Sequence, residues 1–234
     1  MDQLGGTQPR QWLIVDTSPG DRMRFATAKP SDRPRIEDIC EIEIEGLPTF
    51  TDALQKYARE SGKRLTDHEP VLCMAGAVSG EAVHLSRSNW TITRRGLEAV
   101  FDTKVRVIND VVARAWAMRS GLAQVSALRG TGQPSLVKHG RMLKLLVADG
   151  VGAAIVDVNR DGKPRILETE SGHLDFAPSN EREEKLAKAI RGNEATVSWE
   201  KVLTLPADDE IWQQVLPELA SADREKLQAG IPSS

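Results

Sequence analysis

The sequence predicts an α/β protein, in which strands and helices alternate along the chain. Short apolar runs of strand length are separated by segments whose apolar residues recur with helical spacing. This alternation continues through most of the chain, which is typical of sheets whose strands are joined by helices. With 234 residues the chain is long enough for one large domain or two small ones, since a chain of this size buries roughly 70–75% of its unfolded surface.

The expected elements follow from apolar periodicity and from turn residues. Strands are expected near residues 11–16, 36–44, 70–75, 81–85, 105–109, 143–148 and 152–158. Helices are expected near residues 50–62, 92–101, 111–120, 181–191, 198–204 and 209–229. Residues 123–140 contain three glycines and a proline, so this segment is expected to be a long loop.

Composition excludes several classes of protein. With 31 basic and 34 acidic residues the net charge is -3 and no basic block stands out, so nucleic acid is not an expected partner. Cys40 and Cys73 lack metal-ligand spacing and lie in apolar runs, which is typical of reduced core thiols in a cytoplasmic protein. No apolar stretch approaches the ~20 residues that a membrane span requires, and the amino terminus is no signal peptide. We therefore expect a cytoplasmic protein with no metal site of its own.

Two polar side chains follow the apolar strand that ends at Ile108. Asn109 and Asp110 stand at the carboxyl end of this strand, which is where open α/β sheets place their ligands. The same pair also fits a helix N-cap, because a helical pattern begins at Val111. Both interpretations stay open at this point.

A second polar group surrounds a glycine in the segment 170–178. Glu170, His173 and Asp175 lie close together in the sequence around Gly172. Carboxylates accept hydrogen bonds, an amide both donates and accepts, and an imidazole can do either. Together with Asn109 and Asp110, Glu170 and His173 suit the alternating donors and acceptors of a sugar. The alternative for the histidine is a core imidazole bonded to the backbone.

The amino-terminal residues Gly5, Gly6 and Thr7 precede the first expected strand. Glycines followed by a threonine can bring backbone N–H groups against a phosphate. The same residues are also common in a disordered start. Taken with the other motifs in chain order, they resemble the bacterial glucokinase family. The motifs are Gly5-Gly6-Thr7-Gln8-Pro9-Arg10, Ala75-Gly76-Ala77-Val78-Ser79-Gly80, Ile108-Asn109-Asp110 and Glu170-Ser171-Gly172-His173-Leu174-Asp175-Phe176-Ala177-Pro178.

This resemblance runs from about Gly5 to about Leu205 and implies a fold. The family has the ribonuclease-H-like fold of actin and hexokinase-type sugar kinases, in which two domains close on a cleft. Residues 1–110 are then expected to form a small α/β domain that carries the phosphate turn and the sugar-facing Asn-Asp pair. Residues 111–234 are expected to form a large α/β domain that is truncated.

The resemblance also implies an activity, the phosphorylation of glucose at its 6-hydroxyl by ATP with Mg²⁺. Asp110 matches the family's catalytic base, which takes the proton of that hydroxyl. The matched sugar contacts are Asn109, Asp110, Glu170, His173 and Glu200. For Glu200 the alternative is a solvated helix carboxylate. The matched phosphate contacts are Gly5, Gly6, Thr7, Gly150 and Gly152.

The expected nucleotide site departs from the family pattern. The family opens with an apolar strand that ends in Asp-x-Gly-Gly-Thr, whose carboxylate lies near the metal and phosphates. Here Gln3 stands in that place, so the first strand is expected to be missing. Val151 replaces the hydroxyl of the second phosphate loop and Asp149 adds a negative charge, although this segment also fits an ordinary β-turn. ATP is therefore expected to bind weakly. The alternative function is a catalytically silent hexose-binding or regulatory protein.

The resemblance fades after Leu205. Beyond it, apolar residues recur with helical spacing, which is typical of a core or interface stripe. They are Trp212, Val215, Leu216, Leu219 and Leu227. A truncated large domain exposes apolar surface, so a homodimer is expected, with Trp199 and Trp212 as candidate contacts.

Overall fold

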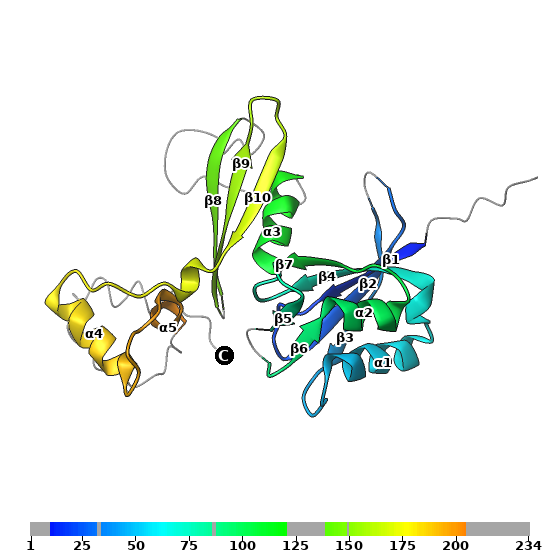
Figure 1. Cartoon of the computed structure of the whole chain (residues 1–234), viewed down its shortest axis with the longest axis horizontal. Helices are drawn as coiled ribbons and strands as arrows, with labels where there is room; N and C mark the ends of the chain where they lie inside the picture. Colours follow the sequence, from blue (N-terminus) through cyan, green and yellow to red (C-terminus); the bar gives the residue numbers. More distant parts are fainter. Residues whose placement is uncertain (1–9, 32–33, 86–87, 121–138, 149, 205–234) are drawn as a thin grey trace, which may run out of the picture. The chain divides into compact units, whose positions relative to one another are not determined.

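The structure is a computed structural model of the whole chain. It describes residues 10–31, 34–85, 88–120, 139–148 and 150–204. The chain divides into two compact units, Met1–Lys138 and His139–Ser234, which are described separately here (Figure 1). Asp110, where the sequence led us to expect the domain boundary, lies within the first unit.

A five-stranded sheet forms the centre of the first unit. Its strands are β1 (Gln11–Asp16), β2 (Arg22–Ala28), β3 (Ile36–Glu43), β4 (His68–Met74) and β7 (Arg106–Asn109). Their order is β3-β2-β1-β4-β7. The strands β1, β2 and β3 pair antiparallel, whereas β1, β4 and β7 are parallel. The carboxyl ends of β1, β4 and β7 therefore meet at one edge of the sheet.

The expectation that the first strand is missing is wrong. The central strand of the sheet is β1, which pairs with β2 on one side and with β4 on the other. Leu13 and Val15 are fully buried along it, and the strand ends at Asp16. An apolar strand that ends in aspartate is thus present, but its Asp16 lies ten residues after Gly6, the second glycine of the pair from which its place had been expected.

Two helices pack on one face of this sheet and close the main core. They are α1 (Phe50–Ser61) and α2 (Arg94–Phe101) (Figure 1). Thr49 begins α1 by accepting a hydrogen bond from the Asp52 N–H at 3.1 Å, which is a standard N-cap. The ring of Tyr57 on α1 stacks on that of Phe25 on β2, with centroids 4.2 Å apart. Because these aromatic rings are buried, they fix the helix against the sheet.

The remaining elements of the first unit are short. They are a 3-10 turn η1 (Leu65–Asp67), a hairpin of β5 (Ala82–His84) and β6 (Thr91–Thr93), and helix α3 (Asp110–Arg119), which follows β7 directly. Helix α3 buries Val111, Val112 and Ala115 and contacts β4 and β7. Its first residue therefore lies at the strand edge described above.

The second unit contains a three-stranded antiparallel sheet and three short helical elements. The strands are β8 (Gly140–Val147), β9 (Val151–Val158) and β10 (Pro164–Thr169), in the order β10-β9-β8. The helical elements are η2 (Ser171–His173), α4 (Glu181–Arg191) and α5 (Trp199–Leu203). A small core of Leu186, Val197 and Val202 joins α4 to α5.

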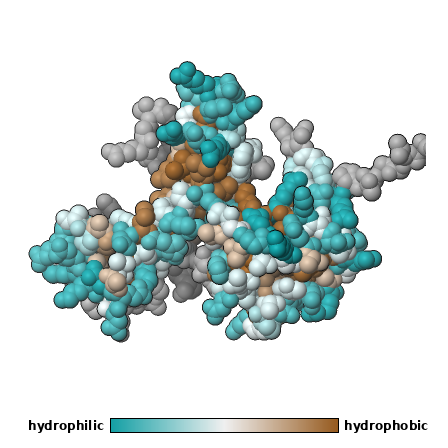
Figure 2. All heavy atoms as spheres, in the orientation of Figure 1, coloured by the Kyte–Doolittle hydropathy of each residue, from teal (hydrophilic) through white to brown (hydrophobic). Residues whose placement is uncertain are grey.

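Apolar side chains gather on the sheet of the second unit, as Figure 2 shows. Leu143, Leu145 and Val147 alternate along β8 and are 66%, 52% and 51% exposed. Within the described ranges, no helix is long and apolar enough to cross a membrane. The expected helix at 209–229 and most of the expected loop at 123–140 lie outside the described residues.

Candidate active site

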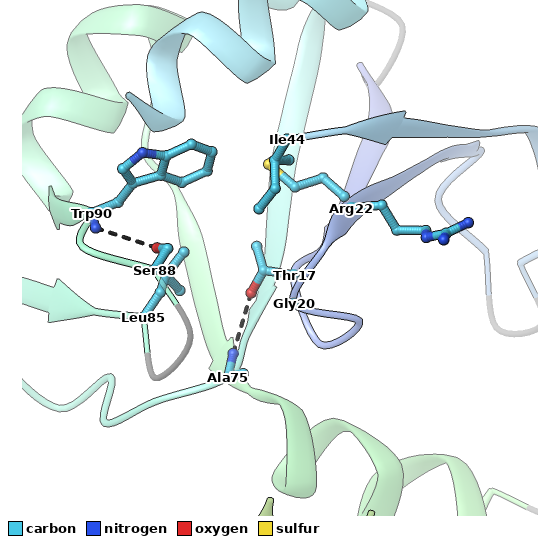
Figure 3. Close-up of a pocket in the computed structure, with 9 residues that line it drawn as sticks. Thr17, Gly20, Arg22, Ile44, Ala75, Leu85, Ser88 and Trp90 are labelled. Carbon is cyan, nitrogen blue, oxygen red and sulfur yellow. Dashed lines mark hydrogen bonds between the residues drawn. The ribbon is translucent and has the colours of Figure 1, made fainter. Parts of the chain in front are cut away.

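Hydrogen bonds join the strand ends at the edge of the first unit's sheet. Thr17, the residue after β1, donates its N–H to the Cys73 carbonyl at 3.0 Å. The Thr17 hydroxyl donates to the same carbonyl at 3.3 Å and accepts from the Ala75 N–H at 3.2 Å (Figure 3). Thr17 is 6% exposed, so these bonds are shielded from water. The ends of β1 and β4 are thereby held together.

Asn109 connects the end of β7 to two other segments. Its side-chain oxygen accepts from the N–H groups of Val111 and Val112 at 2.9 and 3.1 Å, which makes it the N-cap of α3. Its side-chain nitrogen donates to the Gly76 carbonyl at 3.1 Å. The N-cap interpretation of the Asn-Asp pair is therefore confirmed, and the pair also lies at the carboxyl end of β7, where a ligand was expected. A contact between Asn109 and a sugar stays a prediction.

Asp110 presents a half-buried carboxyl group at the same edge. Burial raises the pKa of this carboxyl above its ordinary value, and the negative charge of Asp16 raises it further. A hydrogen bond from the Val111 N–H and the charge of Arg114 act in the opposite direction. A carboxylate with a raised pKa binds a proton more readily, which is the property that a general base requires.

Asp16 belongs to this edge, although sequence reasoning missed it. Its Oδ2 accepts from Arg24 Nη2 at 2.6 Å and its Oδ1 accepts from the Ser18 N–H at 2.9 Å. The Ser18 hydroxyl lies within 3.4 Å of Arg24 Nη2 and 3.5 Å of Arg114 Nη2. The signal was in the sequence, because an apolar strand ends at this aspartate and the turn residues Ser18, Pro19 and Gly20 follow closely.

A small pocket opens beside Thr17, with Ala75, Ser88 and Trp90 among the residues that line it (Figure 3). Trp90 donates its N–H to the Ser88 hydroxyl at 3.3 Å. The cavity has a volume of about 10 Å³, which is room for about one water molecule. It is too small to hold a sugar.

In the second unit, Glu170 and His173 form a pair across η2. His173 Nε2 lies 3.7 Å from Glu170 Oε2, and the two side chains are 55% and 47% exposed. The alternative of a core imidazole is therefore wrong. Both side chains are about half exposed on the surface of this unit.

Glu200 and Gly172 meet at Val151, the first residue of β9. Glu200 Oε2 accepts from the Val151 N–H at 2.7 Å, so Glu200 is not a simple solvated helix carboxylate. A Cβ added to Gly172 would lie 1.9 Å from the Val151 carbonyl oxygen, which only a glycine allows. Of the predicted sugar contacts of the second unit, His173 lies on η2 and Glu200 on α5, both of which contact β9, and Glu170 directly precedes η2.

The expected second phosphate loop is the turn between β8 and β9. Val147 pairs with Val151 across it, and the Ala148 N–H donates to the Gly150 carbonyl at 2.9 Å. This segment is therefore a hairpin turn, with Gly150 and Gly152 on either side of Val151. Its contact with phosphate stays a prediction. The other predicted phosphate contacts, Gly5, Gly6 and Thr7, lie outside the described residues, as do Gln3 and Asp149.

The sheet order, the mixed strand directions and the carboxylates at the strand ends define a class of protein, the ribonuclease-H-like class that includes actin and the sugar kinases. A family model described as Glucokinase matches residues 19–225. The chain belongs to the glucokinase family.

Individual relatives agree with this assignment. Glucokinase of Xylella fastidiosa is 27% identical over 209 residues, and glucokinase of Caulobacter vibrioides is 28% identical over 207 residues. Each alignment covers 85% of this chain and 60% of the relative, so the chain spans only part of the length of these relatives. The crystal structure of glucokinase from Balamuthia mandrillaris in complex with glucose is similar in fold. Its TM-score is 0.60 at 20% identity, with 97% of this chain and 67% of that chain covered.

Proposed function

We propose that this chain binds glucose or a similar hexose and phosphorylates its 6-hydroxyl with ATP as donor. The observation that carries the proposal is the arrangement in the second unit, where Glu200 bonds the Val151 N–H and the Glu170–His173 pair flanks Gly172, which lies against the Val151 carbonyl. Carboxylates and an imidazole at a half-exposed surface suit the hydroxyls of a sugar. Membership of an ATP-dependent kinase family supports the choice of reaction.

Asp110 is the proposed catalytic base. As the 6-hydroxyl oxygen attacks the γ-phosphorus of ATP, its proton passes to the Asp110 carboxylate, the new P–O bond forms, and ADP leaves as the bond to the γ-phosphorus breaks. Such a base contributes roughly 10²–10⁴-fold to the rate. Asn109, which precedes Asp110, is proposed to contact the sugar as well. Gly150 and Gly152 are proposed to approach the phosphates of ATP. Gly5, Gly6 and Thr7 precede β1, whereas the aspartate that the family has before its glycines ends this strand, so these three residues are not proposed as the phosphate turn.

A catalytically silent hexose-binding or regulatory protein is the second candidate function. One observation favours it, namely the ion pair between Asp16 and Arg24 at the end of β1. A carboxylate that already binds a guanidinium is less available to the metal that accompanies ATP. For either function we propose a cytoplasmic location, in line with two cysteines that are both free thiols.

Calorimetry with glucose tests the proposal directly. We expect heat of binding from the full chain, and Glu170→Gln is expected to weaken binding by about tenfold, because a hydrogen bond to a charged group is lost. Glu181→Gln, an exposed change on α4, is the matched control and is expected to leave affinity unchanged.

Folding of each sample is checked by circular dichroism. If folded wild-type protein gave no heat with millimolar glucose, both candidate functions would be rejected. If glucose bound but a coupled assay with ATP and Mg²⁺ gave no turnover, the silent hexose-binding protein would be favoured.

A further inference from the structure

The loop that follows β4 carries a motif, Ala75-Gly76-Ala77-Val78-Ser79-Gly80, to which the proposed function assigns no role. Hydrogen bonds hold this loop, residues 75–80, at its first two residues. The Thr17 hydroxyl accepts from the Ala75 N–H at 3.2 Å, and Asn109 Nδ2 donates to the Gly76 carbonyl at 3.1 Å. The loop therefore reaches the strand edge where Asn109 and Asp110 lie.

Arg94 holds the other end of the loop. Its Nη2 donates to the Val78 carbonyl at 2.6 Å, and its Nε donates to the Gly80 carbonyl at 3.0 Å. Hydrogen bonds from a charged donor are shorter than neutral ones and roughly twice as strong. Because the Val78 side chain is buried in the main core, this end of the loop is fixed to the body of the first unit.

Helix stability alone does not account for an arginine at position 94. Arg94 is the first residue of α2, which Thr93 caps by accepting from the Gly96 N–H at 3.0 Å. The N-terminus of a helix carries a partial positive charge, so a cation in the first turn is unfavourable for the helix. Arg94 nevertheless stands there and bonds two carbonyls of the loop. Its favourable contribution therefore lies in the loop that it binds.

The amide of Asn109 has one N–H left for a ligand. An amide oxygen accepts two hydrogen bonds, and an amide nitrogen donates two. The Asn109 oxygen accepts from the N–H groups of Val111 and Val112, and the nitrogen donates once, to Gly76. The second N–H of this amide has no partner among the residues that the structure describes. The Gly76 carbonyl therefore helps to set the direction of the remaining donor.

We propose that Arg94 is a positioning residue of the sugar site, because it holds loop 75–80 in the place where the Gly76 carbonyl orients the Asn109 amide toward the sugar. The inference rests on the proposed function, since a sugar contact of Asn109 is part of that proposal. In this role Arg94 touches neither the sugar nor the nucleotide. It acts through the loop and Asn109, so its removal changes glucose affinity and the environment of that amide together.

Side-chain signals of the isotope-labelled full chain test the proposal without any ligand. In wild-type protein, the Arg94 Nε–H is expected to exchange slowly with solvent, and one proton of the Asn109 amide is expected to have the chemical shift of a bonded donor. In Arg94→Met, both protons of that amide are expected to move toward the chemical shifts of a solvent-exposed amide. Arg94→Lys, which can still bond one carbonyl, is expected to keep the Asn109 signals close to those of the wild type.

Calorimetry with glucose measures the consequence for binding. We expect Arg94→Met to weaken glucose affinity by about tenfold, since two charge-assisted hydrogen bonds that hold the loop are lost. Asn109→Ser keeps a good helix cap but removes the amide, so it is expected to weaken affinity as well. Because Arg94 acts through Asn109, the double variant is expected to bind glucose no more weakly than Asn109→Ser alone. A merely structural role of Arg94 would make the two losses add.

The matched control is Arg95→Met. Arg95 is the next residue of α2, its side chain is 90% exposed, and its Nε lies 4.0 Å from Glu81 Oε1. The change removes the same charge from the same end of the helix and leaves both Arg94 bonds in place. It is expected to leave the Asn109 signals and glucose affinity unchanged. If wild-type protein gave no heat with glucose, the proposed function would be rejected, and the side-chain signals would still decide the role of Arg94.

Three results would each overturn the inference. One is an Arg94 Nε–H that exchanges in wild-type protein as fast as that of Arg95, a measurement that needs no variant to fold. Another is a folded Arg94→Met variant whose Asn109 amide signals equal those of the wild type. The third is an additive loss of glucose affinity in the double variant.

Discussion

At the scale of single residues, Asp110 combines two properties that a base requires. It lies at an accessible strand edge, and its pKa is raised, chiefly by burial. We expect Asp110→Asn to lower kcat by roughly 10²-fold or more while glucose affinity stays within about tenfold, because only the transition state requires the base. A coupled assay and calorimetry measure the two effects. An unchanged kcat in an active enzyme would reject the role of Asp110.

The raised pKa of Asp110 also predicts how the stability and the activity of the protein change with pH. A carboxyl whose pKa is higher in the folded state favours folding below its unfolded pKa, and this contribution is lost as pH rises through the folded pKa. At neutral pH the ionised carboxylate therefore costs stability. We expect Asp110→Asn to have a Tm at pH 7 equal to or above that of the wild type, and kcat/KM of the wild type to fall as pH drops through the raised pKa. A lower Tm in the variant would mean that Asp110 serves mainly to hold the structure.

The sequence predicted that Asn109 and Asp110 lie at a strand end, as the structure has them, and it missed Asp16 at the same edge for a physical reason. Asn109 and Asp110 were found because a strand that ends in short polar residues is visible in the sequence alone. Asp16 was missed because Gly5 and Gly6 matched the family glycines better than Ser18 and Pro19 do. Asp16 ends the central strand because β1 pairs with β4. The local sequence of one strand does not show which other strands will pair with it.

At the scale of elements, we expect the contact between η2 and β9 to determine the stability of the second unit. We expect Gly172→Ala to lower the free energy of unfolding by about 1–3 kcal/mol, because a Cβ 1.9 Å from the Val151 carbonyl oxygen forces the backbone to move. Glucose affinity is expected to fall as well, since Glu200 bonds the N–H of the same residue. Thermal or urea unfolding and calorimetry provide the measurements.

Gly80→Ala is the control for this change. A Cβ at Gly80 would meet only the Ala82 backbone, at 3.5 Å or more, which is ordinary van der Waals contact. It is expected to leave stability nearly unchanged. Equal effects of the two substitutions would mean that the Gly172 contact is not specific.

Most strands and helices were predictable, but three strands were not. Helix α4 was expected at its observed bounds, 181–191, because it combines an Asn180 cap with a clear helical pattern. The missed strands are β2, β6 and β10. In strand β2, Arg22 and Arg24 alternate with the buried Met23 and Phe25, and two arginines followed by small residues gave only a weak apolar signal. Its pairing with β1 and β3 stabilises it as a strand despite that signal.

At the scale of the whole molecule, the α/β class and the ribonuclease-H-like fold were predictable from the order of the motifs. Self-association stays a prediction. It is based on the exposed side chain of Trp199 and on the exposed apolar side chains of strand β8. We expect sedimentation equilibrium to give a concentration-dependent mass that rises toward that of a dimer. A single monomer mass at all concentrations would contradict this.

The bonds at the sheet edge join segments that are far apart in the chain. Thr17 bonds residues 56 and 58 positions later, and Asn109 bonds a residue 33 positions earlier. Because closing long loops costs entropy before any contact forms, the hairpins β1–β2 and β2–β3 are expected to assemble during folding before β4 and β7 join them. Asp110 and its surroundings are then completed only in the last steps of folding. A newly made chain would therefore acquire much of its secondary structure before the proposed catalytic base is in place.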